Sequence, residues 1–219
     1  TSKNNQSKTD TSKPQMVKRG EYELDAAYTN LFLVNGKNPL PENYEYGKNL
    51  ITIESKYKNG QLDQIDKDIW PYMKAMIEAA WADNVDLKVW SPYRSYETQK
   101  MLFENQVNRN LNKGLSRAEA EAQAATVVAR PGTSEHHTGL AADFNMASDA
   151  FENTKMYEWL KENAADYGFV MRYAKEKQPI TGVILESWHW RFVGINAAKE
   201  MNELNMCLEE YVEHLKNKN

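Results

Sequence analysis

Residues 134–143 read Ser-Glu-His-His-Thr-Gly-Leu-Ala-Ala-Asp, and residues 186–191 read Glu-Ser-Trp-His-Trp-Arg. Three of the four histidines of the chain lie in these two segments, close to acidic residues. Hydrolytic zinc sites use three protein ligands drawn from His, Asp or Glu, leave one position for water, and need a carboxylate base beside that water. Two histidines and two acids from these segments would supply such a set. The pattern alone does not assign it, because a single histidine is more often a structural residue than a ligand.

The first segment is predicted to join a loop to a strand. Residues 130–139 contain one proline and two glycines without helical periodicity, and residues 140–145 form a short apolar run. Loops held on a rigid scaffold are a common position for functional residues. In the second segment, Glu186 and His189 are three residues apart, so a straight strand would point them to opposite faces. If both reach one metal ion, we expect a turn or bulge near Ser187.

The other elements follow from hydrophobic periodicity and turn residues. Because helices and strands are interspersed without a regular β-α-β rhythm, we predict an α+β domain with a central antiparallel sheet and surrounding helices. Strands are predicted at residues 31–34, 50–53, 87–90, 140–145, 169–171 and 188–193. Helices are predicted at about 66–83, 95–111, 116–128, 156–167, 195–204 and 207–216.

The composition fits one medium-sized globular domain. Of the 219 residues, 41% are hydrophobic and 26% are charged, which excludes global disorder and fibrous classes. No apolar run reaches the roughly 18 residues expected of a membrane span. The single cysteine, Cys207, excludes an intrachain disulfide and is expected to be a small buried residue. The net charge of −4 argues against a nucleic-acid partner.

The first 19 residues differ in character from the rest. They carry five Lys or Arg residues and one acid, a local net charge of +4, which leaves −8 for the remainder. With few apolar side chains they cannot offset the entropy of ordering, so residues 1–19 are predicted to be a disordered basic linker and residues 20–219 a folded domain. Such a linker suits a tether to a membrane anchor that precedes this sequence, although a terminus without a role has the same composition.

Several motifs in order identify a family. The pattern Ser134-x-His136-x-x-Gly139-x-Ala141-x-Asp143, followed by Glu186-x-x-His189, resembles the signature of the zinc carboxypeptidases similar to VanY. These enzymes belong with the D-Ala-D-Ala dipeptidases and L,D-carboxypeptidases that trim peptidoglycan stem peptides. The resemblance implies the D-Ala-D-Ala-peptidase (hedgehog-like) zinc fold over most of residues 31–195. Further matches lie at residues 33–35, 38–41, 91–95, 131–136, 167–169, 172–173, 180–182 and 188–189.

The resemblance also implies roles for the matched residues. Glu186 resembles the base that takes a proton from the attacking water and returns it to the leaving amine. Arg94 resembles the cation that polarises the scissile carbonyl and stabilises the oxyanion. The residues that resemble the ligands of a Zn²⁺ ion are His136, Asp143 and His189.

The resemblance implies a substrate contact at Ser134, and Tyr93 and Trp188 are further candidates for substrate contacts. Ser134 resembles the residue that binds the terminal carboxylate of the substrate. It is not expected to be a triad nucleophile, because no Gly-x-Ser-x-Gly elbow surrounds it. For Tyr93, as for Tyr173, packing is an equally good explanation. Trp90, Trp188 and Trp190 are expected in the core, although one of them could line the substrate pocket.

Two positions depart from the family pattern. His137 stands where relatives similar to VanY often have Gln, and Ser187 stands where they often have Pro. The spacing to Asp143 favours His136 as the ligand, but sequence alone does not separate neighbours on a loop, so His137 remains an alternative. His214, on an amphipathic C-terminal helix, is expected to be a surface residue.

By resemblance, the expected activity is removal of the C-terminal D-Ala from stem pentapeptides that end in D-Ala-D-Ala. It would take place outside the cytoplasm of a bacterium, at the membrane or cell wall, and would lower the supply of the target of vancomycin. Glycopeptide resistance and housekeeping wall trimming are both compatible with it. The alternatives are an L,D-carboxypeptidase acting on tetrapeptides and a non-catalytic peptidoglycan-binding module. The presence of the base and all three implied ligands argues for catalysis.

Overall fold

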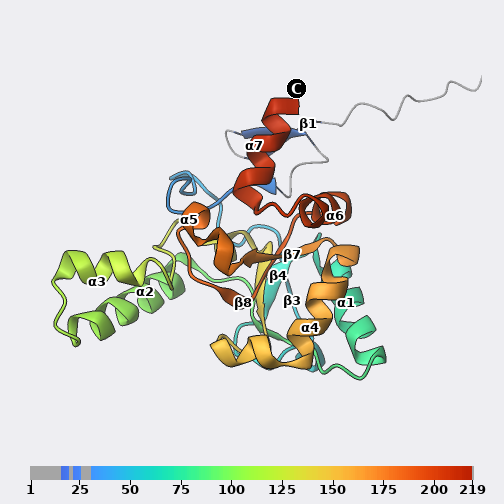
Figure 1. Ribbon diagram of the computed structural model, residues 1–219, viewed down its shortest axis with the longest axis horizontal. Helices are drawn as coiled ribbons and strands as arrows, with labels where there is room; N and C mark the ends of the chain where they lie inside the picture. Colours follow the sequence, from blue (N-terminus) through green and yellow to red (C-terminus); the bar gives the residue numbers. More distant parts are fainter. Residues whose placement is uncertain (1–15, 20–21, 26–30, 219) are drawn as a thin grey trace, which may run out of the picture.

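The computed structural model describes residues 16–19, 22–25 and 31–218 (Figure 1). Its centre is a four-stranded antiparallel sheet with the strand order β5–β6–β8–β7. This arrangement confirms the predicted α+β class with a central antiparallel sheet. The four strands are β5 (Val89–Ser91), β6 (Ala141–Phe144), β7 (Phe169–Tyr173) and β8 (Glu186–Phe192).

Helices surround this sheet. Figure 1 shows α1 and α4 on one side, the α2–α3 pair projecting from another, and α6 and α7 near the C-terminal end. Among the described residues, no helix is long and apolar enough to cross a membrane. The helices are α1 (Trp70–Ala82), α2 (Tyr96–Leu111), α3 (Arg117–Ala124), α4 (Lys155–Asn163), α5 (Gln178–Thr181), α6 (Ile195–Glu203) and α7 (Leu208–Lys218).

Short elements complete the fold. Two further antiparallel pairs are formed by β1 (Met16–Arg19) with β2 (Tyr22–Asp25) and by β3 (Leu50–Thr52) with β4 (Gln64–Asp66). Single 3-10 turns are η2 (Ser55–Tyr57), η3 (Glu135–Thr138), η4 (Asp149–Asn153), η5 (Ala164–Tyr167) and η6 (Lys175–Lys177).

The main core lies between α1, α4 and the sheet. Helix α1 follows Ile69 and carries Pro71 in its first turn, where the missing N–H leaves no hydrogen bond broken. Met73, Met76 and Ile77 recur at helical spacing and are fully buried with the apolar side chains of β6 and β8. A separate small cluster holds α2 to α3. The sheet is therefore packed against the main core, while the α2–α3 pair is held by its own hydrophobic cluster.

Helix caps agree with the sequence. The Ser95 hydroxyl accepts a hydrogen bond from Thr98 N at 3.1 Å, so α2 begins where it was predicted. Ser116 and Glu119 form a capping box at the start of α3, where the sequence predicted the helix to begin. Helix α3 nevertheless ends at Ala124, earlier than predicted, and tight turns follow it.

Residues 31–34 do not form the predicted strand. Leu31 and Val34 are buried, and Leu31 packs with the apolar faces of α6 and α7. Asn35 and Asn38 exchange backbone hydrogen bonds of 3.1 Å and close a turn. In the described part of the chain, the segment before this turn has no paired strand. A short apolar run predicts that its residues are buried, but it does not predict that they pair with another strand. The predicted strand at residues 31–34 is wrong for this reason.

The predicted N-terminal linker falls partly outside the described residues. Residues 1–15 are outside them, whereas residues 16–19 form β1 and pair with residues 22–25. This part of the linker contains a strand, and the division into a linker and a folded domain stays a prediction. Antiparallel pairing satisfies the backbone of each strand without a large apolar core, so composition alone did not reveal it.

The predicted irregularity near Ser187 is confirmed. Met171 of β7 pairs with Trp190, but Tyr173, only two residues later, pairs with Glu186. Strand β8 thus contains extra residues between Glu186 and Trp190, as a β-bulge does. The bulge changes the alternation of side chains, so that Glu186 and His189 can face the same cavity.

Candidate active site

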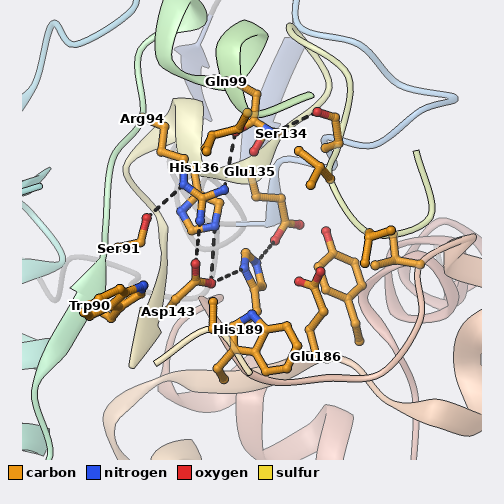
Figure 2. Close-up of a pocket in the computed structure, with 18 of the residues that line it drawn as sticks. Trp90, Ser91, Arg94, Gln99, Ser134, Glu135, His136, Asp143, Glu186 and His189 are labelled. Atoms are coloured by element: carbon orange, nitrogen blue, oxygen red, sulfur yellow. Dashed lines mark hydrogen bonds and ion pairs between the residues drawn. The ribbon is translucent and has the colours of Figure 1, made fainter. Parts of the chain in front are cut away.

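Sheet register brings the candidate ligands together. Asp143 of β6 lies directly opposite His189 of β8, and His136 enters from η3. One ligand atom of each lies within 4.8 Å of the others, and all three side chains are buried. Figure 2 shows the two imidazoles and the carboxylate converging at one point. The three residues expected to hold Zn²⁺ therefore form one site.

Hydrogen bonds determine which atom of each side chain faces that point. His136 Nδ1 donates to Pro92 O at 2.7 Å, which leaves Nε2 facing Asp143 Oδ1 at 3.4 Å. His189 Nδ1 lies 3.1 Å from the same oxygen, while its Nε2 lies 3.3 Å from Glu135 Oε2. The donor set consists of two imidazole nitrogens and one carboxylate oxygen, which fits Zn²⁺. In each of the three side chains, the other nitrogen or oxygen is held by a neighbouring group.

The second oxygen of Asp143 is held by Arg94. Arg94 Nη2 donates to Asp143 Oδ2 at 2.5 Å, and Arg94 Nε donates to Ser91 Oγ at 2.8 Å. Burial opposes ionisation of Asp143, but the charges of His136 and Arg94 outweigh it and hold the pKa of this carboxyl below its ordinary value. Asp143 is therefore an anion at neutral pH, as a metal ligand must be.

The two histidines differ in protonation. Burial, together with the charge of Arg94, lowers the pKa of His136 to about 4, so its imidazole is neutral at pH 7. Burial also acts against a charge on His189, but its hydrogen bonds to Asp143 and Glu135 outweigh burial and raise its pKa to about 9. A metal ion binding here would take the place of a proton on His189.

Glu186 lies beside His189 at the edge of the same cavity (Figure 2). Burial, which leaves the residue only 9% exposed, raises the pKa of its carboxyl to about 7. A carboxyl whose pKa is close to the working pH is well suited to take up and release a proton.

The cavity has a volume of about 790 Å³ and contains most of the predicted site. Arg94, Ser134, Glu186 and Trp188 line it together with the three candidate ligands. Trp90, which was predicted in the core, instead lines the cavity and is 41% exposed, because it alternates with buried neighbours along β5. The core positions predicted for Trp190 and Cys207 are confirmed.

Tyr93 is the one predicted site residue that does not line this cavity. Its hydroxyl lies against Gly47, on the side of the chain away from the candidate ligands. The backbone explains this, since Tyr93 N donates to Gln64 O at 2.9 Å and Arg94 N donates to His136 O at 3.1 Å. These bonds fix the segment so that Arg94, and not Tyr93, lines the cavity, and the substrate contact of Tyr93 stays a prediction.

His137, the alternative ligand, lies apart from the three grouped residues. Its Nε2 accepts from Gly132 N at 3.1 Å, and its Nδ1 donates to Arg94 O at 2.8 Å. Both ring nitrogens are thus occupied by backbone groups. The ring lines a second cavity, of about 560 Å³, and lies edge-on to Tyr46. His137 therefore supports the loop, and His136 is the neighbour that lies with Asp143 and His189.

The remaining candidates lie away from the site. His214 is half-buried on α7 and stacks on Tyr211, so it is less exposed than predicted. Burial raises the pKa of Cys207 to about 11, which makes this thiol a poor nucleophile.

Three buried charged residues next to the site were not singled out from the sequence. Glu135 contacts His189, Arg172 and Arg191. A signal was available, because Arg172 and Arg191 lie in apolar strands, where a charge is costly unless it is paired. Their partner could not be inferred, since Glu135 is distant from both in sequence.

The chain is similar to known carboxypeptidases. The family profile described as "VanY: D-alanyl-D-alanine carboxypeptidase" matches residues 62–195. A D-alanyl-D-alanine carboxypeptidase of Enterococcus faecalis is 42% identical over 84% of this chain. The chain spans 65% of the length of that relative.

Solved structures agree with this. A variant of the vancomycin-resistance D,D-pentapeptidase VanY from a VanB-type cassette, in complex with Zn(II), aligns at 42% identity and a TM-score of 0.72, covering 84% of this chain and 98% of that one. The LD-carboxypeptidase LdcB aligns at 34% identity and a TM-score of 0.73, covering 91% of this chain and 94% of that one. The expected zinc-peptidase fold is therefore confirmed.

Proposed function

Because the chain belongs to the VanY D-alanyl-D-alanine carboxypeptidase family, we propose that it is a zinc-dependent D,D-carboxypeptidase that removes the terminal D-Ala from peptidoglycan stem pentapeptides ending in D-Ala-D-Ala. The observation that carries this proposal is the meeting of a His-Asp-His set, a buried carboxyl and a guanidinium in one cavity. The related D,D-pentapeptidase whose structure contains Zn(II) supports the choice of metal.

The metal would be held by His136 Nε2, Asp143 Oδ1 and His189 Nδ1. When bound, Zn²⁺ supplies a Lewis acid that polarises a carbonyl and lowers the pKa of water to about 7. The protein contributes a preformed donor set, because Pro92 O fixes the tautomer of His136 and Arg94 fixes the carboxylate of Asp143. Little reorganisation is then needed when substrate arrives.

Glu186 would act as the general base and then as the general acid. As a carboxylate it takes a proton from the attacking water, and as a carboxylic acid it gives that proton to the leaving amine nitrogen of D-Ala. With a pKa of about 7, both forms are accessible at neutral pH. Such proton transfer typically contributes about 10²–10⁴ in rate.

Arg94 would contact the scissile carbonyl of the substrate, and Ser134 would contact its terminal carboxylate. The Arg94 guanidinium, only 15% exposed and fixed by Ser91 and Asp143, is well placed to stabilise negative charge developing on the carbonyl oxygen. Ser134, buried at the cavity wall, would donate to the terminal carboxylate of the substrate. Trp188 would line the pocket between them.

The natural substrates would be peptidoglycan stem peptides or their precursors, met outside the cytoplasm at the cell wall. Attachment to the membrane would require a segment preceding this sequence, with residues 1–19 as its tether. Removing D-Ala there would lower the number of peptides ending in D-Ala-D-Ala, the target of vancomycin, whether for resistance or for wall trimming.

The test is mass spectrometry of a stem pentapeptide and the matching tetrapeptide after incubation with the zinc-loaded protein. Loss of one alanine from the pentapeptide alone supports the proposal, provided that a Glu186→Gln control is inactive. Loss from the tetrapeptide alone would replace it with L,D-carboxypeptidase activity, which the similarity to LdcB favours as the second candidate. If neither peptide is cleaved by protein that binds zinc, a binding module becomes the better explanation.

A further inference from the structure

A buried group of charges contacts His189 through Glu135, which also lines the cavity. We call it the ion cluster, and its members come from η3, β7, β8 and α7. The side chains of three members are fully buried, and the fourth is 14% exposed. Its members are Glu135, Arg172, Arg191 and Glu209.

The two carboxylate oxygens of Glu135 have different partners. Oε1 accepts from Arg172 Nε at 2.7 Å and lies 2.9 Å from Arg191 Nη1. Oε2 faces His189 Nε2 at 3.3 Å. One oxygen therefore fixes the carboxylate to two arginines, while the other is directed at the imidazole.

Arg172 is in turn held from the C-terminal helix. Its Nη1 and Nη2 donate to the two carboxylate oxygens of Glu209 at 2.8 and 2.6 Å. Asn35 Nδ2 donates to Glu209 Oε1 at 2.9 Å. A continuous chain of charge-assisted hydrogen bonds thus runs from α7 to Nε2 of His189.

Stability alone does not explain why these four positions carry charged side chains. Two arginines and two glutamates balance in charge, but burying them carries a desolvation penalty that apolar side chains would not have. It contacts the candidate metal site through Glu135 Oε2 on His189 Nε2. A carboxylate at this position accepts a hydrogen bond from Nε2–H, so Nδ1, which faces Asp143, is the nitrogen that would exchange its proton for a metal ion.

We propose that Glu135 is a positioning residue of the metal site: it accepts a hydrogen bond from the Nε2–H of His189 and so holds Nδ1 toward the metal, while Arg172 and Arg191 fix Glu135 itself. The inference rests on the zinc site of the proposed function. Loss of such a supporting carboxylate typically weakens metal binding by about 10–100-fold.

The test compares Glu135→Gln with Glu209→Gln, the same chemical change at the other end of Arg172. Zinc affinity is measured by competition with a chromogenic chelator, and thermal unfolding of the metal-free proteins is recorded in parallel. We expect Glu135→Gln to bind zinc about 10–100-fold more weakly. Glu209→Gln should lose thermal stability but keep its zinc affinity within about threefold, a change of roughly 0.6 kcal/mol.

Two results would overturn the inference. One is zinc binding by Glu135→Gln within threefold of the unsubstituted protein. The other is an equal loss of zinc affinity in both variants, which would mean that the cluster acts only through overall stability.

A second measurement does not depend on any variant retaining its fold. Long-range ¹H–¹⁵N spectra of the zinc-loaded, histidine-labelled protein report which nitrogen of each ring carries hydrogen and which binds metal. We expect one metal-bound ring with a protonated Nε2, assigned to His189, and another with a protonated Nδ1, assigned to His136. Coordination of zinc through Nε2 of both rings would refute the role of Glu135.

Failure of the proposed function would look different. An unsubstituted protein that binds no zinc, or that binds zinc and cleaves no stem peptide, contradicts the carboxypeptidase. An active zinc enzyme in which Glu135→Gln binds zinc normally contradicts the positioning role alone.

Discussion

The imidazole of His189 separates two regions with different electrostatics. Near its Nδ1, the carboxyls of Asp143 and Glu186 and the guanidinium of Arg94 line the cavity that is open to substrate. Near its Nε2, the two arginines and two glutamates of the ion cluster balance each other and are almost fully buried. The balanced side can hold a ligand in place, and the cavity side leaves room for a cation. The two nitrogens of one ring thus serve reactivity and support.

The largest expected effect comes from removing the metal on the cavity side. Dialysis against a chelator should abolish pentapeptide hydrolysis. It should also lower the melting temperature by about 5–10 °C, because zinc at about 100 times its Kd stabilises the fold by about 2.7 kcal/mol. Peptide cleavage and differential scanning calorimetry measure the two effects. Added zinc should restore both, and an undiminished rate in excess chelator would refute the metal mechanism.

Replacing the cavity carboxyl without touching the ligands should separate chemistry from metal binding. Glu186→Gln keeps the size of the side chain but removes the base, so kcat should fall by about 10²–10⁴. Zinc content, measured by atomic absorption, should stay at that of the unsubstituted protein. A variant with nearly normal turnover would show that another group carries the proton.

On the buried side, the main effect should be on stability. Burial opposes ionisation of Glu209, but the charge and hydrogen bonds of Arg172, with a hydrogen bond from Asn35, outweigh it and hold the pKa of Glu209 below its ordinary value. Removing one partner of a buried ion pair typically costs about 3–5 kcal/mol. Glu209→Gln should therefore lower the free energy of unfolding at pH 7 by about 3 kcal/mol.

The same variant has a predicted pH dependence. A lowered pKa in the folded state means that the stability from ionised Glu209 is fully present above the ordinary pKa and is lost as pH falls through the folded value. The difference between Glu209→Gln and the unsubstituted protein should therefore shrink from pH 7 to pH 3. Urea unfolding at both values measures it, and a difference independent of pH would contradict the ion pair.

The smallest effect is expected at His137, whose ring lines the second cavity and contacts the backbone groups of Gly132 and Arg94. His137→Gln introduces the residue that relatives often carry, and an amide can donate to Arg94 O and accept from Gly132 N as the imidazole does. Because each neutral hydrogen bond contributes about 1 kcal/mol, we expect kcat/KM to change by less than about fivefold. Steady-state kinetics and zinc titration measure this. Loss of bound zinc would show that His137 and not His136 is the ligand.

The sequence predicted the features that depend on local pattern. Ser95 and Ser116 marked helix starts because capping involves residues only three positions apart. The spacing of Glu186 and His189 predicted the bulge in β8, because side chains alternate strictly along a straight strand. Apolar periodicity likewise placed α1 and the strands of the central sheet.

Other features depended on long-range contacts. The orientation of Tyr93 away from the cavity follows from backbone bonds to Gln64 and, through Arg94, to His136. Residues 31–34 are buried without pairing, because α6 and α7 cover Leu31 where a neighbouring strand would otherwise be needed. Neither outcome can be calculated from the residues next to these positions.

The sequence by itself determined which residue types meet at the site, because motif order and spacing place His136, Asp143, Glu186 and His189 on a loop and two strands. Only the tertiary structure decided between His136 and His137, and only it joined Glu135 to His189 and the ion cluster. The physical reason is that burial and periodicity are encoded locally. The partner of a buried charge, by contrast, is chosen by the register of the sheet and the packing of α7, which bring distant residues into contact.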